Sequence, residues 1–97
     1  MKRIVYRPEA VVDVEEASRW YDNQRPGLGI EFLAALRAAE DAVRALPLAY
    51  PVHRRDVRWF LLHRFPYRLL YRVAEKVIVV VACYHVRRSP RGLKGRG

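Results

Sequence analysis

The stretch Arg64–Arg88, RFPYRLLYRVAEKVIVVVACYHVRR, decides the fold, because it predicts two neighbouring strands of one sheet. Tyr67–Val73 alternates strictly between two faces, and this period of two is typical of a strand whose faces meet different surroundings. Val77–Tyr84 is a continuous run rich in β-branched residues, the pattern of a strand buried on both sides. The run ends in the basic cluster His85–Arg88, where charge needs either a partner or a ligand.

The turn between these strands decides which side chains share a face. A two-residue turn at Glu75-Lys76 pairs Arg68 with Cys83, whereas a three-residue turn shifts this pairing by one residue. The two-residue turn separates apolar from charged side chains better, so it is the register that we predict. One face would then hold the charged residues Arg68, Arg72, His85 and Arg87. The opposite, wholly apolar face would hold Tyr67, Leu69, Tyr71, Val73, Ile78, Val80, Ala82, Tyr84 and Val86.

Outward from these strands, helical and extended patterns alternate with breaks at Pro and Gly. Toward the N-terminus they predict a strand at Val57–His63, a loop at Leu48–Asp56, helices at about Leu28–Ala45 and Pro8–Tyr21, and a strand at Lys2–Arg7. The apolar stripe of the first helix is Val11, Val14, Ala17 or Ser18, and Tyr21; that of the second is Leu33, Leu36, Ala39 or Glu40, Val43 and Leu46. The order β-α-α-β-β-β predicts an α+β fold in which a helical hairpin covers one face of an antiparallel sheet. Residues 1–88 are expected to form one domain, followed by a basic, glycine-rich tail at residues 89–97.

The charge of the chain is uneven along its 97 residues. The formal net charge is +9. Residues 1–45 carry seven basic and eight acidic side chains, and residues 46–97 carry twelve and two. This asymmetry indicates a polyanionic partner, either a nucleic acid or an acidic protein segment.

A single cysteine excludes an internal disulfide. Cys83 lies in the predicted buried strand, is expected to be an inert core thiol, and fits a reducing, cytoplasmic location. The longest apolar run, Val77–Tyr84, is too short to span a bilayer, and the N-terminus does not resemble a signal peptide, so no membrane partner is expected.

Few residues carry obvious chemistry. The three histidines and Cys83 do not stand at metal-ligand spacing and no phosphate loop is present, so neither a metal nor a cofactor is expected. The carboxylates of the first helix are interpreted as a solvated face. Metal-free RNA cleavage needs a cation for the phosphate and an acid and a base, for which Arg68, His85 and Arg87 are the candidates. Ordinary strand residues, or a basic face that receives an acidic peptide, are the simpler interpretations of the same residues.

A set of segments spread over almost the whole chain suggests a family. They are ASRWY at 17–21, QRPGLG at 24–29 with EFL at 31–33, Tyr50-Pro51 after Pro47, FPYRLLYRV at 65–73, and Ala82–Arg88 with Pro90. In their order and spacing they resemble the RelE/ParE superfamily of type II toxin–antitoxin toxins, which includes proteins named for plasmid stabilisation. The resemblance implies the same small α+β fold. It also implies a cognate acidic antitoxin that wraps the toxin and neutralises it.

The superfamily has two functional branches, and the chain shares features with both. RelE-like members are ribosome-dependent mRNA endonucleases, and Arg68, His85 and Arg87 match or lie near basic positions of that branch. ParE-like members inhibit DNA gyrase by binding. The segment Leu48–Val52 lacks the carboxylate that one nuclease subgroup uses as its base, and the ending of the chain resembles ParE-type endings.

Three hypotheses follow from this resemblance. We expect a ParE-like toxin that inhibits growth by binding a target such as DNA gyrase. The alternatives are a RelE-like mRNA interferase that acts on ribosome-bound mRNA, and a degenerate, non-toxic interaction protein. Contacts with the antitoxin or the target are expected at Arg54, Arg55, Arg58, Arg72, Tyr84 and Arg88.

Overall fold

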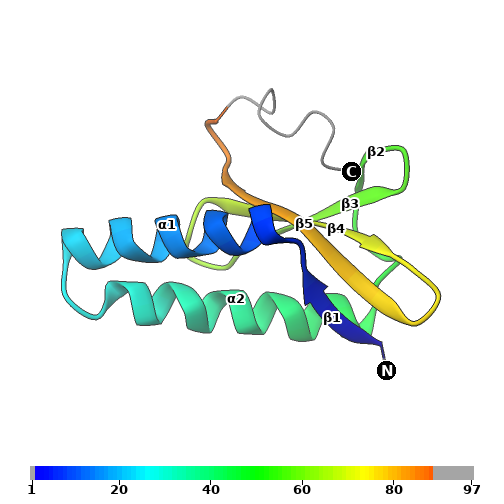
Figure 1. Cartoon of the computed structure of the whole chain (residues 1–97), viewed down its shortest axis with the longest axis horizontal. Helices are drawn as coiled ribbons and strands as arrows, with labels where there is room; N and C mark the ends of the chain where they lie inside the picture. Colours follow the sequence, from blue (N-terminus) through cyan, green and yellow to red (C-terminus); the bar gives the residue numbers. More distant parts are fainter. Residues whose placement is uncertain (1, 89–97) are drawn as a thin grey trace.

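The computed structural model describes residues 2–88, which form a helical hairpin and one five-stranded sheet (Figure 1). The elements in chain order are β1 (Arg3–Tyr6), α1 (Pro8–Gln24), α2 (Leu28–Ala45), β2 (Val52–Arg54), β3 (Val57–Leu61), β4 (Tyr67–Val73) and β5 (Val77–His85). This arrangement confirms the predicted α+β class. The predicted basic tail lies outside the described residues.

The sheet has the strand order β1-β5-β4-β3-β2 and is mixed, whereas an antiparallel sheet was predicted. The difference comes from β1, which pairs in parallel with β5, with Ile4 opposite Ile78. A parallel pair needs a long connection between its strands, and the helical hairpin and the three intervening strands provide it. The segment predicted as a loop contributes the short edge strand β2, which pairs with β3.

Local sequence determines where the two helices begin and end. Pro8 stands in the first turn of α1, where its missing N–H has no partner to lose, and Glu9 lies at the positive end of the helix dipole. Gly27 adopts a left-handed conformation, with φ of 90°, that reverses the chain into α2. Gly29 then lets α2 approach α1 closely, because a Cβ there would lie 2.7 Å from the carbonyl oxygen of Ser18.

The helices bury most of the predicted apolar stripes but differ from them at three positions. In α2 the buried side chains are Phe32, Leu36, Ala39 and Val43, so Phe32 occupies the place predicted for Leu33. Leu33 and Leu46 are exposed instead, and in α1 Val11 is exposed as well. Leu36, Ala39 and Val43 confirm the rest of the predicted stripe. At its start Phe32 fills the core in place of Leu33 and packs edge to face on Tyr67, with ring centroids 5.2 Å apart.

The ladder between β4 and β5 changes register halfway along. Close to the turn, Val73 pairs with Ile78, as the predicted two-residue turn requires. Beyond the midpoint Leu70 pairs with Ala82, because Val81 is an extra residue in β5 and forms a bulge. The bulge allows both Val81 and Ala82 to be buried in one cluster with Leu70, on the face of the sheet away from the helices (the far face).

The bulge makes the predicted face assignment wrong beyond this point. Arg68 pairs with Tyr84 instead of Cys83, and His85 pairs with Tyr67. Cys83 and His85 therefore lie on the helix-covered face, where Tyr67 packs in the main core, while Arg68 and Tyr84 lie on the far face. Strand alternation alone could not reveal this, because an inserted residue reverses the alternation without changing its period.

Candidate functional site

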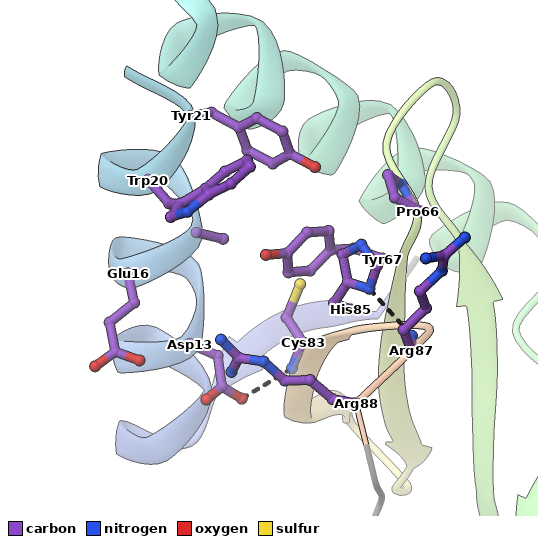
Figure 2. A pocket seen from close by; sticks show the side chains of 11 residues that line it. Asp13, Glu16, Trp20, Tyr21, Pro66, Tyr67, Cys83, His85, Arg87 and Arg88 are labelled. Carbon is purple, nitrogen blue, oxygen red and sulfur yellow. Dashed lines mark hydrogen bonds between the residues drawn. The ribbon is translucent and has the colours of Figure 1, made fainter. Parts of the chain in front are cut away.

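A groove of about 700 Å³ lies between α1 and the end of β5, on the helix-covered side of the sheet (Figure 2). The groove has one wall on α1 and one on the sheet side, with Cys83 at its floor. The α1 wall consists of Asp13, Glu16, Ala17, Trp20 and Tyr21. The strand wall consists of Pro66, Tyr67, His85, Arg87 and Arg88. A volume of this size suits a few side chains of a partner or a small ligand.

Aromatic rings line one end of the groove. Trp20 is 56% exposed and packs edge to face on Tyr21, with ring centroids 5.1 Å apart. Across the groove, His85 packs edge to face on Tyr67 at 5.3 Å. Figure 2 shows the Trp20 and Tyr21 rings on one side and the Tyr67 and His85 rings on the other. This end can receive an apolar or aromatic group.

The floor of the groove is tied to α1 by a hydrogen bond. The backbone N–H of Cys83 donates to Oδ2 of Asp13 at 3.0 Å, so this carboxylate is not part of a simple solvated face (Figure 2). Burial, and secondarily the Asp13 charge, raises the pKa of the Cys83 thiol to about 12. The thiol is therefore neutral near pH 7 and unsuited to act as a nucleophile.

The basic end of β5 is held in a tight turn. The N–H of Val86 donates to the Pro66 carbonyl at 2.9 Å, and the N–H of Arg88 donates to the His85 carbonyl at 2.9 Å. The N–H of Arg87 donates to Nδ1 of His85 at 3.0 Å, so Nδ1 is an acceptor and the neutral imidazole carries its proton on Nε2. These bonds keep the two arginines at the strand wall of the groove.

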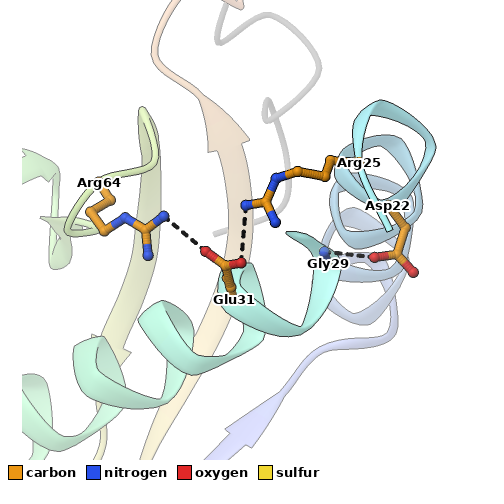
Figure 3. Close-up of polar contacts among 5 residues, drawn as sticks. All are labelled: Asp22, Arg25, Gly29, Glu31 and Arg64. Carbon is orange, nitrogen blue, oxygen red and sulfur yellow. Dashed lines mark hydrogen bonds and ion pairs between the residues drawn. The ribbon is translucent and has the colours of Figure 1, made fainter. Parts of the chain in front are cut away.

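A carboxylate braces the loop that carries Pro66. Glu31 at the start of α2 accepts a hydrogen bond from Arg25 at 3.0 Å and one from Arg64 at 2.9 Å (Figure 3). The hydrogen bonds from Arg64 and Arg25 lower the pKa of Glu31. Beside this brace, Oδ1 of Asp22 accepts the N–H of Gly29 at 2.8 Å, which fixes the turn between the helices. The brace links the helical turn to the β3–β4 loop, and the loop is linked to the end of β5 through Pro66.

The structure brings together only some of the predicted chemical residues. His85, Arg87 and Arg88 line the groove. Arg68 lies on the far face, with its guanidinium carbon 4.3 Å from the centre of the Trp59 ring. Arg72 shares that face because it pairs with Val57 of the far-face cluster.

The other predicted contact residues lie away from the groove. Tyr84 is buried in the far-face cluster. Arg54 and Arg55 stand where β2 turns into β3, at the sheet edge farthest from β1. Arg58 donates to the Tyr50 carbonyl at 2.7 Å, so its guanidinium helps to hold the chain before β2.

Sequence reasoning missed the α1 wall of the groove. Asp13, Glu16 and Trp20 were not predicted as site residues, although their spacing of three and four places them along one helix face. A carboxylate pair followed by a tryptophan on an otherwise solvated face was the signal that could have found them.

Residues 2–88 show no group of three or more His, Cys, Asp and Glu side chains that could hold a metal ion. The same part of the chain has no helix long and apolar enough to cross a membrane.

Comparison with known proteins adds a family and a fold. Residues 4–90 match the model of the family described as the ParE toxin of the type II toxin-antitoxin system, parDE. Among solved structures, the chain is similar to one described as "Chromosomal ParDE TA system from P. aeruginosa", with a TM-score of 0.67 and 20% sequence identity. The similarity covers 90% of this chain and 98% of the other, and at this identity it shows the fold alone. No curated protein matches the chain.

Proposed function

The chain belongs to the ParE toxin family of type II toxin–antitoxin systems, and from this membership we propose that it inhibits growth by binding a cellular target such as DNA gyrase. In the same proposal a cognate acidic antitoxin neutralises it, and the chain acts in the cytoplasm. The basic residues Arg54, Arg55, Arg58, Arg72 and Arg88, together with Tyr84, are proposed to contact the antitoxin or the target.

The separation of Arg68 from His85 is the observation that favours binding over RNA cleavage. A nuclease needs its phosphate-binding cation and its acid or base within hydrogen-bonding reach of one scissile phosphate. Arg68 stacks on Trp59 on the far face, whereas His85 packs on Tyr67 on the helix-covered face. The sheet stands between them, so the two side chains cannot engage one phosphate in this conformation.

The uneven charge of the chain supports the acidic antitoxin. The excess of basic side chains lies in residues 46–97, which hold twelve of them against two acidic ones. A partner rich in Asp and Glu is attracted to such a surface and associates with it faster. No specific contact is needed for this attraction, which acts over about 10 Å at 0.1 M salt.

The experiment that tests this proposal compares two activities of the purified chain. We expect it to inhibit supercoiling by DNA gyrase and to leave mRNA intact on translating ribosomes. In cells, induction without the antitoxin should produce filaments and a DNA-damage response, and co-expression of the antitoxin should prevent both. The variant Arg68→Ala should still inhibit growth.

Two results would contradict the proposal. Rapid cleavage of translated mRNA, lost in both Arg68→Ala and His85→Ala, would assign the chain to the mRNA interferases instead. Harmless expression of the folded, antitoxin-free chain would identify it as a degenerate interaction protein.

A further inference from the structure

The groove between α1 and β5 presents apolar surface that the described chain leaves uncovered. Trp20, on the α1 wall, is a large apolar side chain and is 56% exposed. Its ring faces a space of about 700 Å³ bounded by Tyr67 and His85 on the opposite wall. Withdrawing a tryptophan and its neighbours from water is favourable, so an occupant with an apolar anchor would be stabilised here.

The charges of the groove differ from those of the whole chain. Two carboxylates, Asp13 and Glu16, stand on the α1 wall, and two guanidinium groups, Arg87 and Arg88, stand on the strand wall. The groove is thus electrically balanced, although the chain carries a net charge of +9. A phosphate backbone or a uniformly acidic segment would gain from one wall and be repelled by the other. A segment with an acidic side chain on one flank and a basic side chain on the other would gain from both.

The groove is also held in shape before anything binds. The Asp13 carboxylate ties its floor to α1, and the turn at His85–Arg88 fixes the strand wall through backbone hydrogen bonds. The Glu31 brace holds the loop that supplies Pro66. A site that is formed in advance loses less conformational entropy on binding and discriminates more sharply between orientations.

We propose that this groove binds a peptide segment of a protein partner through an apolar or aromatic anchor, and that the opposed charges of its walls select the order of acidic and basic side chains around that anchor. Trp20 and Tyr67 receive the anchor, Glu16 attracts the basic flank, and Arg87 attracts the acidic flank. The inference rests on the proposed function only in taking the partner to be a protein. It makes Glu16 and Arg87 specificity-determining residues.

The experiment uses phage-displayed linear 12-residue peptides selected on the full chain. The selected peptides should share an apolar or aromatic residue flanked by one acidic and one basic side chain. Binding is followed by tryptophan fluorescence, because Trp20 and Trp59 are the only two tryptophans and lie on opposite sides of the sheet. The emission of Trp59→Phe, which retains Trp20, should change on titration. The matched variant Trp20→Phe should show no change.

A charge swap tests the orientation rule without altering the net charge. The double variant Glu16→Arg, Arg87→Glu exchanges the charges of the two residues that meet the flanks, whereas Asp13 and Arg88 keep theirs. Both substituted side chains are exposed, so the fold should be retained. The hydrogen bond to His85 is also kept, because Arg87 donates it through its backbone. We expect the selected peptide to bind this variant about tenfold more weakly, and its charge-swapped counterpart to recover that loss.

Three outcomes would overturn the inference. Selected peptides that are uniformly acidic, or that bind the swap variant unchanged, would show that only the general charge of the chain matters. A Trp20 response to a single-stranded oligonucleotide instead of to the peptides would make the groove a nucleic-acid site. These measurements do not use gyrase, ribosomes or growth. Their failure would therefore contradict the peptide-binding groove without contradicting the proposed toxicity.

Discussion

At the scale of the residue, Tyr71 shows how one buried polar group joins the helices to the sheet. Its side chain is fully buried, and its hydroxyl donates a hydrogen bond of 2.7 Å to the Pro47 carbonyl just beyond α2. Burial raises the pKa of this hydroxyl to about 12. The neutral, hydrogen-bonded phenol is thus part of the folded state, and the phenolate is excluded from it.

The pH dependence of stability should report Tyr71. The pKa is about 12 in the folded chain against 10.0 for an ordinary tyrosine, so the contribution of Tyr71 is complete below pH 10 and is lost as the pH rises toward 12. We expect the free energy of unfolding, measured with urea, to fall across this window. In Tyr71→Phe the fall should be shallower, and stability at pH 7 should be lower by about 1 kcal/mol because the Pro47 carbonyl loses its donor. An identical pH slope in the variant would contradict this role.

At the same scale, the sequence predicted which charged residues lie near the site, but not which of them share a face of the sheet. His85, Arg87 and Arg88 were singled out from their place at the end of an apolar strand, and they do line the groove. Arg68 was grouped with them from the alternation of β4, and the extra residue Val81 places it on the other side of the sheet. Such a side-chain grouping depends on one insertion in a ladder, which local propensity does not determine.

At the scale of the element, the turn of the helical hairpin contains two glycines that are required for different reasons. A Cβ on Gly29 would lie 2.7 Å from the Ser18 carbonyl oxygen, whereas a Cβ on Gly27 would meet nothing within 4 Å. Gly27 is needed for its φ of 90° instead. Close helix contact and chain reversal are thus separate requirements in this short turn.

Replacing each glycine by alanine should separate these requirements. We expect Gly29→Ala to lower the free energy of unfolding by about 2 kcal/mol, because backbone must move to admit the methyl group. Gly27→Ala should cost about 1 kcal/mol, from the left-handed conformation alone. Urea denaturation of both variants provides the measurement. A Gly29→Ala variant as stable as the unchanged chain would mean that α1 and α2 do not pack this closely.

The Glu31 brace predicts a second pH effect, at the acid end. Its pKa is lowered from 4.5 by Arg64 and Arg25, so its contribution is present above pH 4.5 and is lost as the pH falls through the lower folded value. Glu31→Gln should therefore melt at a lower temperature than the unchanged chain at pH 7, with the difference vanishing in acid. Hydrogen exchange in the β3–β4 loop should be faster in this variant.

The control for this brace is the isolated exposed pair between Asp41 and Arg44, three residues apart on α2. Asp41→Asn should leave the exchange of the β3–β4 loop unchanged, because that pair joins nothing to the loop. If both substitutions changed the hydrogen exchange of the loop equally, Glu31 would act only as an ordinary surface charge and would not hold the loop.

The sequence was most informative about elements with strong local signals. The bounds of α2 and β4 agree with the prediction, since Pro47, the glycine turn and a strict period of two define them. The prediction from sequence failed for β2, which is only three residues long, and for the parallel pairing of β1 with β5. Both depend on neighbours far away in the chain, so a short local pattern contains little information about them.

At the scale of the whole molecule, charge and specificity are located in different places. The excess positive charge belongs to residues 46–97, whereas the groove holds equal numbers of acidic and basic side chains. Long-range attraction would then bring an acidic partner to the surface, and the groove would choose among the segments that arrive.

This division predicts how salt acts on antitoxin binding. Raising NaCl from about 50 to 500 mM should slow association about tenfold or more and change dissociation little, because screening weakens the long-range field most. Stopped-flow fluorescence measures both rates. The charge-swap variant keeps the net charge, so its association rate should show the same salt dependence. A salt effect confined to dissociation would place the attraction in the bound contacts instead.

The bulge at Val81 has a consequence for recombination between relatives. β5 is two half-strands of opposite phase joined end to end. The sequence shows an unbroken apolar run there because both faces of the strand pack in hydrophobic clusters, so the change of phase is hidden. A chimera that takes the end of β5 from a donor without the extra residue would join two phases that do not match. The transplanted side chains would then emerge on the wrong side of the sheet. Crossover points in this strand should therefore lie outside the Val80–Ala82 unit, which has to be inherited whole.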